Sequence, residues 1–185
     1  MNVGVLGLQG AVREHLRALG RLGVETLVVK TVAALESLDG LILPGGESTT
    51  MSLLAQGGLL EELRRLSAAG FPMFGTCAGM ILLANEVAGR KEPILGAIDI
   101  AVARNASGRQ VDSFETVLEV DGVGSDVPAV FIRAPYVTRV GPSVDVLARH
   151  QGVAVMARQG KILVASFHPE LTEDLRIHRL FVDMI

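Results

Sequence analysis

The chain contains one cysteine, and the residues around it are typical of a nucleophile elbow. Cys77 stands between Gly75 and Gly79 in the run Gly75-Thr76-Cys77-Ala78-Gly79. Apolar residues precede this run and helix-forming residues follow it, which predicts a strand, a tight turn and a helix. Glycines on both sides of the turn permit a sharp bend and close packing. A thiol at a helix N-terminus is a candidate nucleophile, because that position favours the thiolate. The alternative is a small buried hydrophobic residue.

A histidine and a carboxylate near the C-terminus can supply the base that such a thiol needs. His168 and Glu170 lie two positions apart in the run Phe167-His168-Pro169-Glu170. Side chains two positions apart in extended backbone point to the same side, and Pro169 favours an extended backbone. A histidine so placed can act as general base while the carboxylate orients its ring. Taken alone, the same pair also fits an ordinary surface contact at the end of a strand.

A glycine-rich turn is a second candidate for chemistry. The run Gly45-Gly46-Glu47-Ser48-Thr49 follows an apolar segment and precedes a helical one. Backbone N–H groups in such a turn can bind an oxyanion or a substrate carboxylate. The alternative is a plain helix start with Ser48 or Thr49 as the N-cap. A phosphate-binding loop is disfavoured, because no Gly-Lys-Ser or Gly-Lys-Thr follows.

The composition excludes several classes of protein. The 185 residues are 49% hydrophobic and carry a net charge of −3, which predicts one domain over 1–185 and gives no basic footprint for nucleic acid. A single cysteine allows no intramolecular disulfide and no zinc cluster, and we expect neither a metal nor a cofactor. No apolar stretch approaches the ~20 residues of a membrane span, and the N-terminus lacks the basic region that is typical of a signal peptide. We therefore expect a cytoplasmic protein that contacts no membrane.

The elements that must position these residues alternate in the first half of the chain. The apolar pattern predicts strands over 2–8, 25–30 and 41–43 and a fourth leading into Cys77. Continuous apolar strands that alternate with helices predict a parallel sheet covered on both faces. The helical patterns lie over 11–22, 51–69 (in one piece or two around Gly57-Gly58) and 78–84, with a short helix or turn over 32–38.

The second half reads mainly as strands, and we expect them to continue the sheet in antiparallel fashion. Gln159-Gly160 predicts a hairpin turn, and 175–185 predicts a final amphipathic helix. The fold class is therefore α/β, with three layers and a mixed, mostly parallel sheet. Cys77 and His168 both follow strands, where open α/β sheets place their sites. The predicted strands are 97–103, 113–120, 129–132, 144–149, 153–158 and 162–167.

Taken together, the two motifs around Cys77 and His168 resemble those of the class I (triad) glutamine amidotransferases. Their fold is flavodoxin-like, in agreement with the class predicted above. Further runs narrow the resemblance to the glutaminase subunits of pyridoxal 5'-phosphate synthase, and they span nearly the whole chain in the family's order. These runs are Gly7-Leu8-Gln9-Gly10-Ala11 with Glu14-His15, Pro44 through Thr50, Arg104-Asn105 with Gly108-Arg109-Gln110, Ser113-Phe114-Glu115, Phe131 through Pro135, and Ser166 through Thr172 with Asp174.

The resemblance implies hydrolysis of L-glutamine to L-glutamate and ammonia. Cys77 is implied as the nucleophile that attacks the side-chain amide, His168 as the proton carrier, and Glu170 as the residue that orients His168. Arginine suits a substrate carboxylate because its planar group binds both oxygens, although by their type alone Arg104 and Arg133 fit solvated surface charges better. The implied oxyanion hole is Gly46 and Ala78, and the implied glutamine contacts are Gly46, Glu47, Ser48, Arg104, Ile132 and Arg133.

The resemblance also implies a partner. In the family, an oligomeric synthase subunit with a (β/α)₈ barrel combines the ammonia with ribose 5-phosphate and glyceraldehyde 3-phosphate to make pyridoxal phosphate. The implied contact includes Gln9. The alternative is that Gln9 is an ordinary turn residue. Two alternatives stay open from the residues alone: an amidotransferase that serves a different acceptor enzyme, and a non-catalytic module on the same fold.

Overall fold

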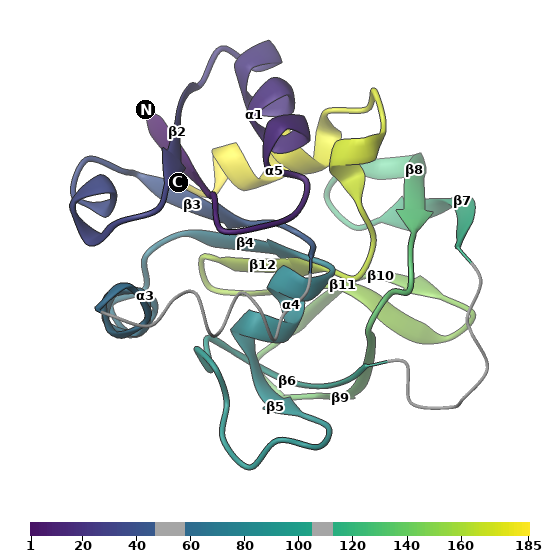
Figure 1. The fold of residues 1–185 in the computed structure, drawn as a ribbon. Helices are drawn as coiled ribbons and strands as arrows, with labels where there is room; N and C mark the ends of the chain where they lie inside the picture. Colours follow the sequence, from purple (N-terminus) through teal and green to yellow (C-terminus); the bar gives the residue numbers. More distant parts are fainter. Residues whose placement is uncertain (47–57, 105–112) are drawn as a thin grey trace.

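The computed structural model describes residues 1–46, 58–104 and 113–185, and a seven-stranded sheet lies at its centre (Figure 1). The strand order is β10-β11-β12-β4-β3-β1-β2. Only β11 runs antiparallel to its neighbours, so the sheet is mixed and mostly parallel, as predicted. The strands are β1 (Asn2–Leu6), β2 (Glu25–Val29), β3 (Gly40–Leu43), β4 (Met73–Thr76), β10 (Asp145–His150), β11 (Val153–Gln159) and β12 (Ile162–Ala165).

Helices cover both faces of this sheet and complete a three-layer α/β fold. On one face lie α1 (Val12–Arg21) and α5 (Arg176–Asp183), and on the other lie α3 (Leu59–Ala68) and α4 (Ala78–Leu83) (Figure 1). The fold class predicted from the sequence is confirmed. Two short 3₁₀ turns, η1 (Val32–Leu35) and η2 (Pro169–Leu171), follow β2 and β12.

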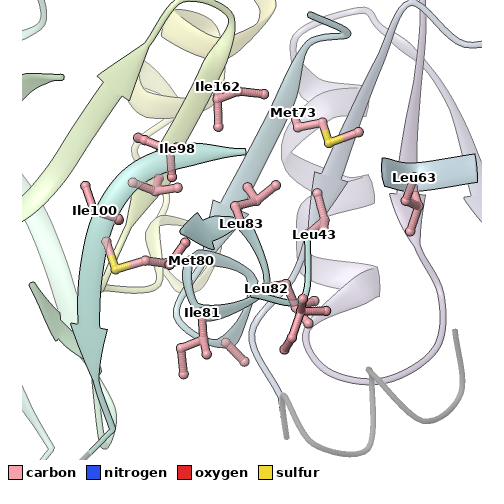
Figure 2. Packing of buried hydrophobic residues seen from close by; sticks show 14 of the residues in the cluster. Leu43, Leu63, Met73, Met80, Ile81, Leu82, Leu83, Ile98, Ile100 and Ile162 are labelled. Atoms are coloured by element: carbon pink, nitrogen blue, oxygen red, sulfur yellow. The ribbon is translucent and has the colours of Figure 1, made fainter. Parts of the chain in front are cut away.

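Three apolar runs of the first half form the central strands β1, β3 and β4, whereas β2 lies at the edge of the sheet and is mostly exposed. Every residue of β3 and β4 is buried, as expected of parallel strands between two helical layers. The α3 and α4 side packs through the residues labelled in Figure 2, among them Leu63, Met73 and Leu83. Each such side chain contributes about 1.5–3 kcal/mol by leaving water, so this packing holds β4 and α4, and the turn between them, in place.

Part of the second half does not join the main sheet, and that prediction is wrong. The predicted strand 97–103 belongs to a three-stranded sheet of β5 (Ala84–Val87), β6 (Ile98–Ala103) and β9 (Tyr136–Val140). The predicted strands 113–120 and 129–132 pair with each other instead, as β7 (Phe114–Val120) and β8 (Gly124–Phe131). An alternating apolar pattern shows that a segment is a strand, but it does not say which sheet supplies the partner.

The sequence pattern did not predict two of the strands, and one predicted helix lies only partly within the described residues. β5 begins at Ala84, the last residue of the helix predicted over 78–84, and β9 is short and half polar. The helix predicted over 51–69 corresponds to α3 from Leu59, directly after Gly58 at φ 99°. Residues 51–57 of that prediction lie outside the described residues. Within the described part of the chain, no helix is both long and apolar enough to cross a membrane.

Candidate active site

Cys77 lies at the sharp turn between β4 and α4, as the elbow motif predicts. Its backbone has φ 48° and ψ −106°, a conformation rare outside glycine. The Cys77 N–H donates to the carbonyl oxygen of Ala165 at the end of β12 (2.8 Å), which fixes the turn against the neighbouring strand. The side chain is 9% exposed, and its sulfur lies 3.9 Å from the carbonyl oxygen of Ile132. A strained backbone that is held by its surroundings is typical of a functional residue.

The two flanking glycines permit this turn because other backbone occupies the space of their missing side chains. A β-carbon on Gly79 would lie 1.9 Å from the carbonyl oxygen of Leu43 in β3. A β-carbon on Gly75 would lie 2.5 Å from the backbone of Gly79 itself. Both distances are far below van der Waals contact, so α4 can pack this closely on the sheet only with glycine at these positions.

His168 and Glu170 meet beside Cys77, although the backbone between them is not extended as predicted. Pro169 begins the 3₁₀ turn η2, because its fixed φ also suits the first position of a helical turn. The side chains nevertheless converge, and His168 Nδ1 lies 2.7 Å from Glu170 Oε1. The His168 N–H donates to the carbonyl oxygen of Val130 (2.8 Å), which ties this turn to β8. The histidine and the carboxylate are therefore paired, both being less than 10% exposed.

The charge state of His168 follows from its two neighbours. Burial by itself lowers the pKa of this imidazole. The hydrogen bonds and the electrostatic interactions with Cys77 and Glu170 together outweigh burial and raise the pKa of His168 to about 10. His168 is therefore an imidazolium at neutral pH, with a carboxylate on one side and the sulfur of Cys77 on the other.

A cavity of about 540 Å³ opens beside this pair, and the segments that follow β1, β3, β4, β8 and β12 line it. Gly45 and Gly46, which follow β3, share it with Cys77 and His168. Gly46 has φ 150° and Gly10 has φ 95°, and a β-carbon on Gly10 would lie 1.5 Å from the carbonyl oxygen of Gly45. The turn after β1 is therefore packed directly on the glycine pair. The carboxyl ends of the strands thus form the site that the fold predicts.

The remaining predicted site residues fall into three groups. Gln9, Ile132 and Arg133 line the cavity, and Arg133 has the unusual φ of 43°. Ala78 is the first residue of α4, where helix N–H groups lack partners within the helix. Arg104 follows β6, is exposed and does not line the cavity. Glu47 and Ser48 lie outside the described residues.

Sequence reasoning missed a group of buried polar side chains behind the triad. His15 Nε2 lies 3.2 Å from Thr76 Oγ1 and 3.5 Å from Glu170 Oε2, and His15 Nδ1 lies 3.0 Å from His178 Nε2. Thr76 Oγ1 also accepts the N–H of Gly45 at 3.2 Å. One signal was present, because His15 falls on the apolar stripe of α1, three residues after Val12.

The arrangement has the parts needed for acyl transfer. It combines a thiol on a rigid turn, an imidazolium beside it and a carboxylate that orients the ring. Gly46 and Cys77, the residue before α4, both line the cavity, so backbone N–H groups near it can stabilise an oxyanion. In the parts of the chain that the structure describes, no cluster of three or more His, Cys, Asp or Glu side chains has the arrangement of a metal site.

Comparison with known proteins agrees with this geometry. The model of the SNO glutamine amidotransferase family matches residues 5–185. A pyridoxal 5'-phosphate synthase subunit PdxT from a Geobacillus species is 55% identical over 186 aligned positions, covering 100% of this chain and 97% of the relative. The subunit of the same name from Carboxydothermus hydrogenoformans is 56% identical, with 100% and 98% covered. A crystal structure described as a glutamine amidotransferase superposes with a TM-score of 0.93 at 53% identity, covering 98% of this chain and 97% of the other.

Proposed function

Because this chain belongs to the SNO glutamine amidotransferase family, we propose that it is the glutaminase subunit of a pyridoxal 5'-phosphate synthase. It hydrolyses L-glutamine to L-glutamate and ammonia, and it supplies the ammonia to a separate synthase subunit. The relatives named as subunits of that synthase cover the whole chain at 55% and 56% identity. The cavity contains the groups that this reaction needs: a nucleophile, a proton carrier and backbone N–H groups.

One observation carries the chemical part of the proposal: His168 interacts with Cys77 and Glu170 at the same time. Nδ1 of His168 is occupied by Glu170 at 2.7 Å, which leaves Nε2 for the sulfur and for the substrate. The raised pKa of His168 keeps a proton on the ring at neutral pH. A thiolate paired with an imidazolium is the reactive state of a cysteine nucleophile.

The reaction then proceeds in two steps. The sulfur of Cys77 attacks the amide carbon of glutamine, and the bond to nitrogen breaks as His168 gives its proton to the leaving ammonia. The product of this step is a glutamyl thioester on Cys77. Water, deprotonated by the now neutral His168, attacks the thioester and releases glutamate, which restores the thiolate and the imidazolium. Glu170 holds the ring in one tautomer throughout.

The other residues of the site take supporting roles in the proposal. The N–H groups of Gly46 and Ala78 form the oxyanion hole, in which donors aimed at the developing charge commonly contribute about 3–4 kcal/mol each. Ile132 and Arg133 line the cavity beside the sulfur, where a substrate backbone can be held. By the resemblance alone, Glu47, Ser48 and Arg104 complete the glutamine contacts with Gly46, Ile132 and Arg133, although Arg104 is not among the residues that line the described cavity.

The partner is an oligomeric synthase subunit with a (β/α)₈ barrel, and Gln9 is part of the docking surface. Gln9 is exposed at the cavity, and the next residue, Gly10, packs on Gly45. A partner that moves this turn therefore acts directly on the neighbouring Gly46. We further propose that 1–185 form one domain and that the complex is cytoplasmic.

The test measures ammonia release from glutamine by the purified chain, alone and with the synthase subunit of a relative. Release that rises on mixing supports the proposal, and Cys77→Ala abolishes it while the complex still forms. Cys77→Ser is the matched variant: it keeps the shape of the elbow but replaces the thiol by a hydroxyl, and we expect it to be inactive as well. Stimulation by a different acceptor enzyme, and none by this synthase, would contradict the assigned pathway. Hydrolysis retained in Cys77→Ala would contradict the assigned nucleophile.

A further inference from the structure

Two histidines that the proposed reaction does not use lie directly behind the triad carboxylate. His15 on α1 and His178 on α5 are completely buried, and their rings meet through one nitrogen each, with His15 Nδ1 3.0 Å from His178 Nε2. The other nitrogen of His15, Nε2, lies between Thr76 Oγ1 (3.2 Å) and Glu170 Oε2 (3.5 Å). A buried polar chain therefore runs from α5 through α1 to Glu170, and Glu170 continues it to His168.

Both histidines are neutral inside the protein. Burial, followed by the neighbouring His178 and His168, lowers the pKa of His15 well below its ordinary value. Burial also lowers the pKa of His178 to about 4. The titratable groups that face the pair are Glu170 from η2 and His168 at the start of that turn. Each ring therefore carries one proton, and two protons are shared among four nitrogens.

The contacts decide where the two protons lie. Because His15 Nδ1 and His178 Nε2 face each other at 3.0 Å, one of them donates and the other accepts. If His15 donated, His178 would carry its own proton on Nδ1, a buried atom that has no hydrogen-bond partner among the described residues. The lone pair of His15 Nε2 would then face the carboxylate.

The opposite arrangement leaves no N–H group without an acceptor. His178 donates from Nε2 to His15 Nδ1, and His15 carries its proton on Nε2, towards Thr76 Oγ1 and Glu170 Oε2. Only an acceptor, His178 Nδ1, then stays unpaired, and unpaired acceptors are tolerated in protein interiors better than unpaired N–H groups. This arrangement also gives Glu170 Oε2 a donor, which it otherwise lacks within the described residues.

We propose that His15 is a positioning residue for the glutaminase reaction, with its Nε2–H directed at the free oxygen of Glu170, and that His178 fixes the tautomer of His15. The inference rests on the proposed function, since it assigns a role within that reaction. Glu170 would be held from two sides, by His168 on Oε1 and by His15 on Oε2. The distance of 3.5 Å is long for a hydrogen bond, as is common for catalytic contacts before substrate binds.

The same histidine also reaches the oxyanion side of the site. Thr76 Oγ1 accepts the N–H of Gly45 and faces His15 Nε2. Gly45 immediately precedes Gly46, the proposed oxyanion donor. His15 is therefore linked to both halves of the site, to the base through Glu170 and to the glycine turn through Thr76, while being completely buried itself.

The first test reads the tautomers directly and needs no substrate. Nitrogen-15 NMR of the imidazole rings in the full chain distinguishes a proton on Nδ1 from one on Nε2. The proposal requires Nε2–H on both His15 and His178 at pH 7. A proton on Nδ1 of either ring, or a charged His15, would overturn it.

The second test compares two substitutions of nearly equal shape, His15→Gln and His15→Met. Both residues are unbranched helix formers, but only glutamine can donate an N–H towards Glu170 and accept one from His178. The readouts are alkylation of Cys77 by iodoacetamide against pH, and kcat and KM for glutamine hydrolysis in the complex with the synthase subunit. The alkylation readout reports the Cys77–His168 pair without any turnover.

We expect His15→Gln to stay within about threefold of the natural chain, and His15→Met to lose about tenfold or more in kcat with little change in KM. In His15→Met the alkylation rate at pH 7 falls by about tenfold, the effect of one pKa unit in the paired groups. His178→Gln and His178→Met give the same ordering with smaller losses, and they stand in if the His15 variants do not fold. Equal behaviour of the glutamine and methionine variants would overturn the proposal.

Failure of the proposed function and failure of the positioning role of His15 give different experimental results. If the natural chain shows the assigned tautomers and the alkylation difference but no hydrolysis of glutamine with any synthase subunit, the proposed function fails and the positioning role stands. If hydrolysis is normal but methionine at position 15 changes neither kcat nor alkylation, the positioning role fails and the proposed function stands.

Discussion

Gly45 lies against the ring of His168: a β-carbon on Gly45 would be 2.4 Å from His168 Cε1 and 3.1 Å from His168 Nδ1. The same β-carbon would be 3.3 Å from Cβ of Cys77. The glycine therefore allows the nucleophile and the base to approach each other across the end of β3. Glycine has no side chain that could take part in the reaction, so the function of Gly45 is to leave this space open.

Gly45→Ala should therefore disable the site without unfolding the chain. The added methyl group displaces the ring of His168 away from Cys77, and misplacement of a catalytic group by about 1 Å can cost on the order of 10²-fold in rate. The measurement is kcat/KM for glutamine with the synthase subunit present, together with a thermal unfolding curve. Gly20→Ala is the matched control, because nothing lies within 4 Å of its β-carbon. An active Gly45→Ala would contradict this reading of the contact.

Gly79→Ala should act on stability, since its β-carbon would meet the backbone of β3 and not a movable side chain. The carbonyl oxygen of Leu43 would lie 1.9 Å away, and α4 must shift from the sheet to relieve the clash. Overpacking of this kind costs typically about 1–3 kcal/mol. We expect a lower midpoint in urea unfolding than in the natural chain. A midpoint equal to that of Gly20→Ala would show that α4 can move freely.

Glu170→Gln should change the pH dependence of the reaction as well as its rate. The hydrogen bond and the charge of Glu170 both help to raise the pKa of His168, so their loss makes the ring release its proton at a lower pH. We expect kcat/KM to fall by about 10²–10⁴-fold and the alkaline limb of the profile to move towards neutral pH.

Glu173→Gln is the control for that experiment, three residues along the chain. Glu173 is exposed and pairs with Arg17 and Arg21 on the surface. Exposed ion pairs of this kind contribute little to stability, and no atom of Glu173 lines the cavity beside Cys77. Its rate and pH profile should match those of the natural chain. An unshifted alkaline limb in Glu170→Gln would mean that the carboxylate does not control the protonation of His168.

Because two histidines are buried, we expect the protein to lose stability at mildly acidic pH. The folded state lowers the pKa of His178 from 6.5 to about 4, so the unfolded chain binds the proton more tightly. The stabilisation that depends on a neutral His178 is complete above pH 6.5 and is lost as the pH falls towards 4. Full loss amounts to roughly 3 kcal/mol, and His15 adds to it in the same direction. The pKa of His168 is shifted in the opposite direction. Its contribution to the free energy of unfolding is therefore constant below pH 6.5 and is lost only as the pH rises towards about 10, so it does not oppose the loss in acid.

Urea unfolding at pH 7 and pH 5 measures this effect. The free energy of unfolding should fall between the two pH values, and the fall should be smaller in His178→Gln, which has no titrating group at that position. If His178→Gln and the natural chain lose equal stability between pH 7 and pH 5, groups other than His178 cause the acid sensitivity.

Several features of this protein could be derived from the sequence because they depend on neighbours in the chain. The apolar run, the two glycines and Cys77 predict the elbow, since the turn is built within a few residues. The alternation of strands and helices over the first half predicts the parallel sheet. The pairing of His168 with Glu170 was predicted too, although the backbone between them forms a 3₁₀ turn at Pro169 and not an extended segment.

Only the tertiary structure decided which distant residues meet. His15, Thr76, Glu170 and His178 come from α1, β4, η2 and α5, and their contacts span up to 163 positions in the chain. The contact of Gly45 with His168 and the division of the later strands into three sheets are of the same kind. Periodicity fixes which side of an element is buried, but it carries no information about the partner that covers it. That choice is made by packing and by the pairing of buried polar groups across the whole fold.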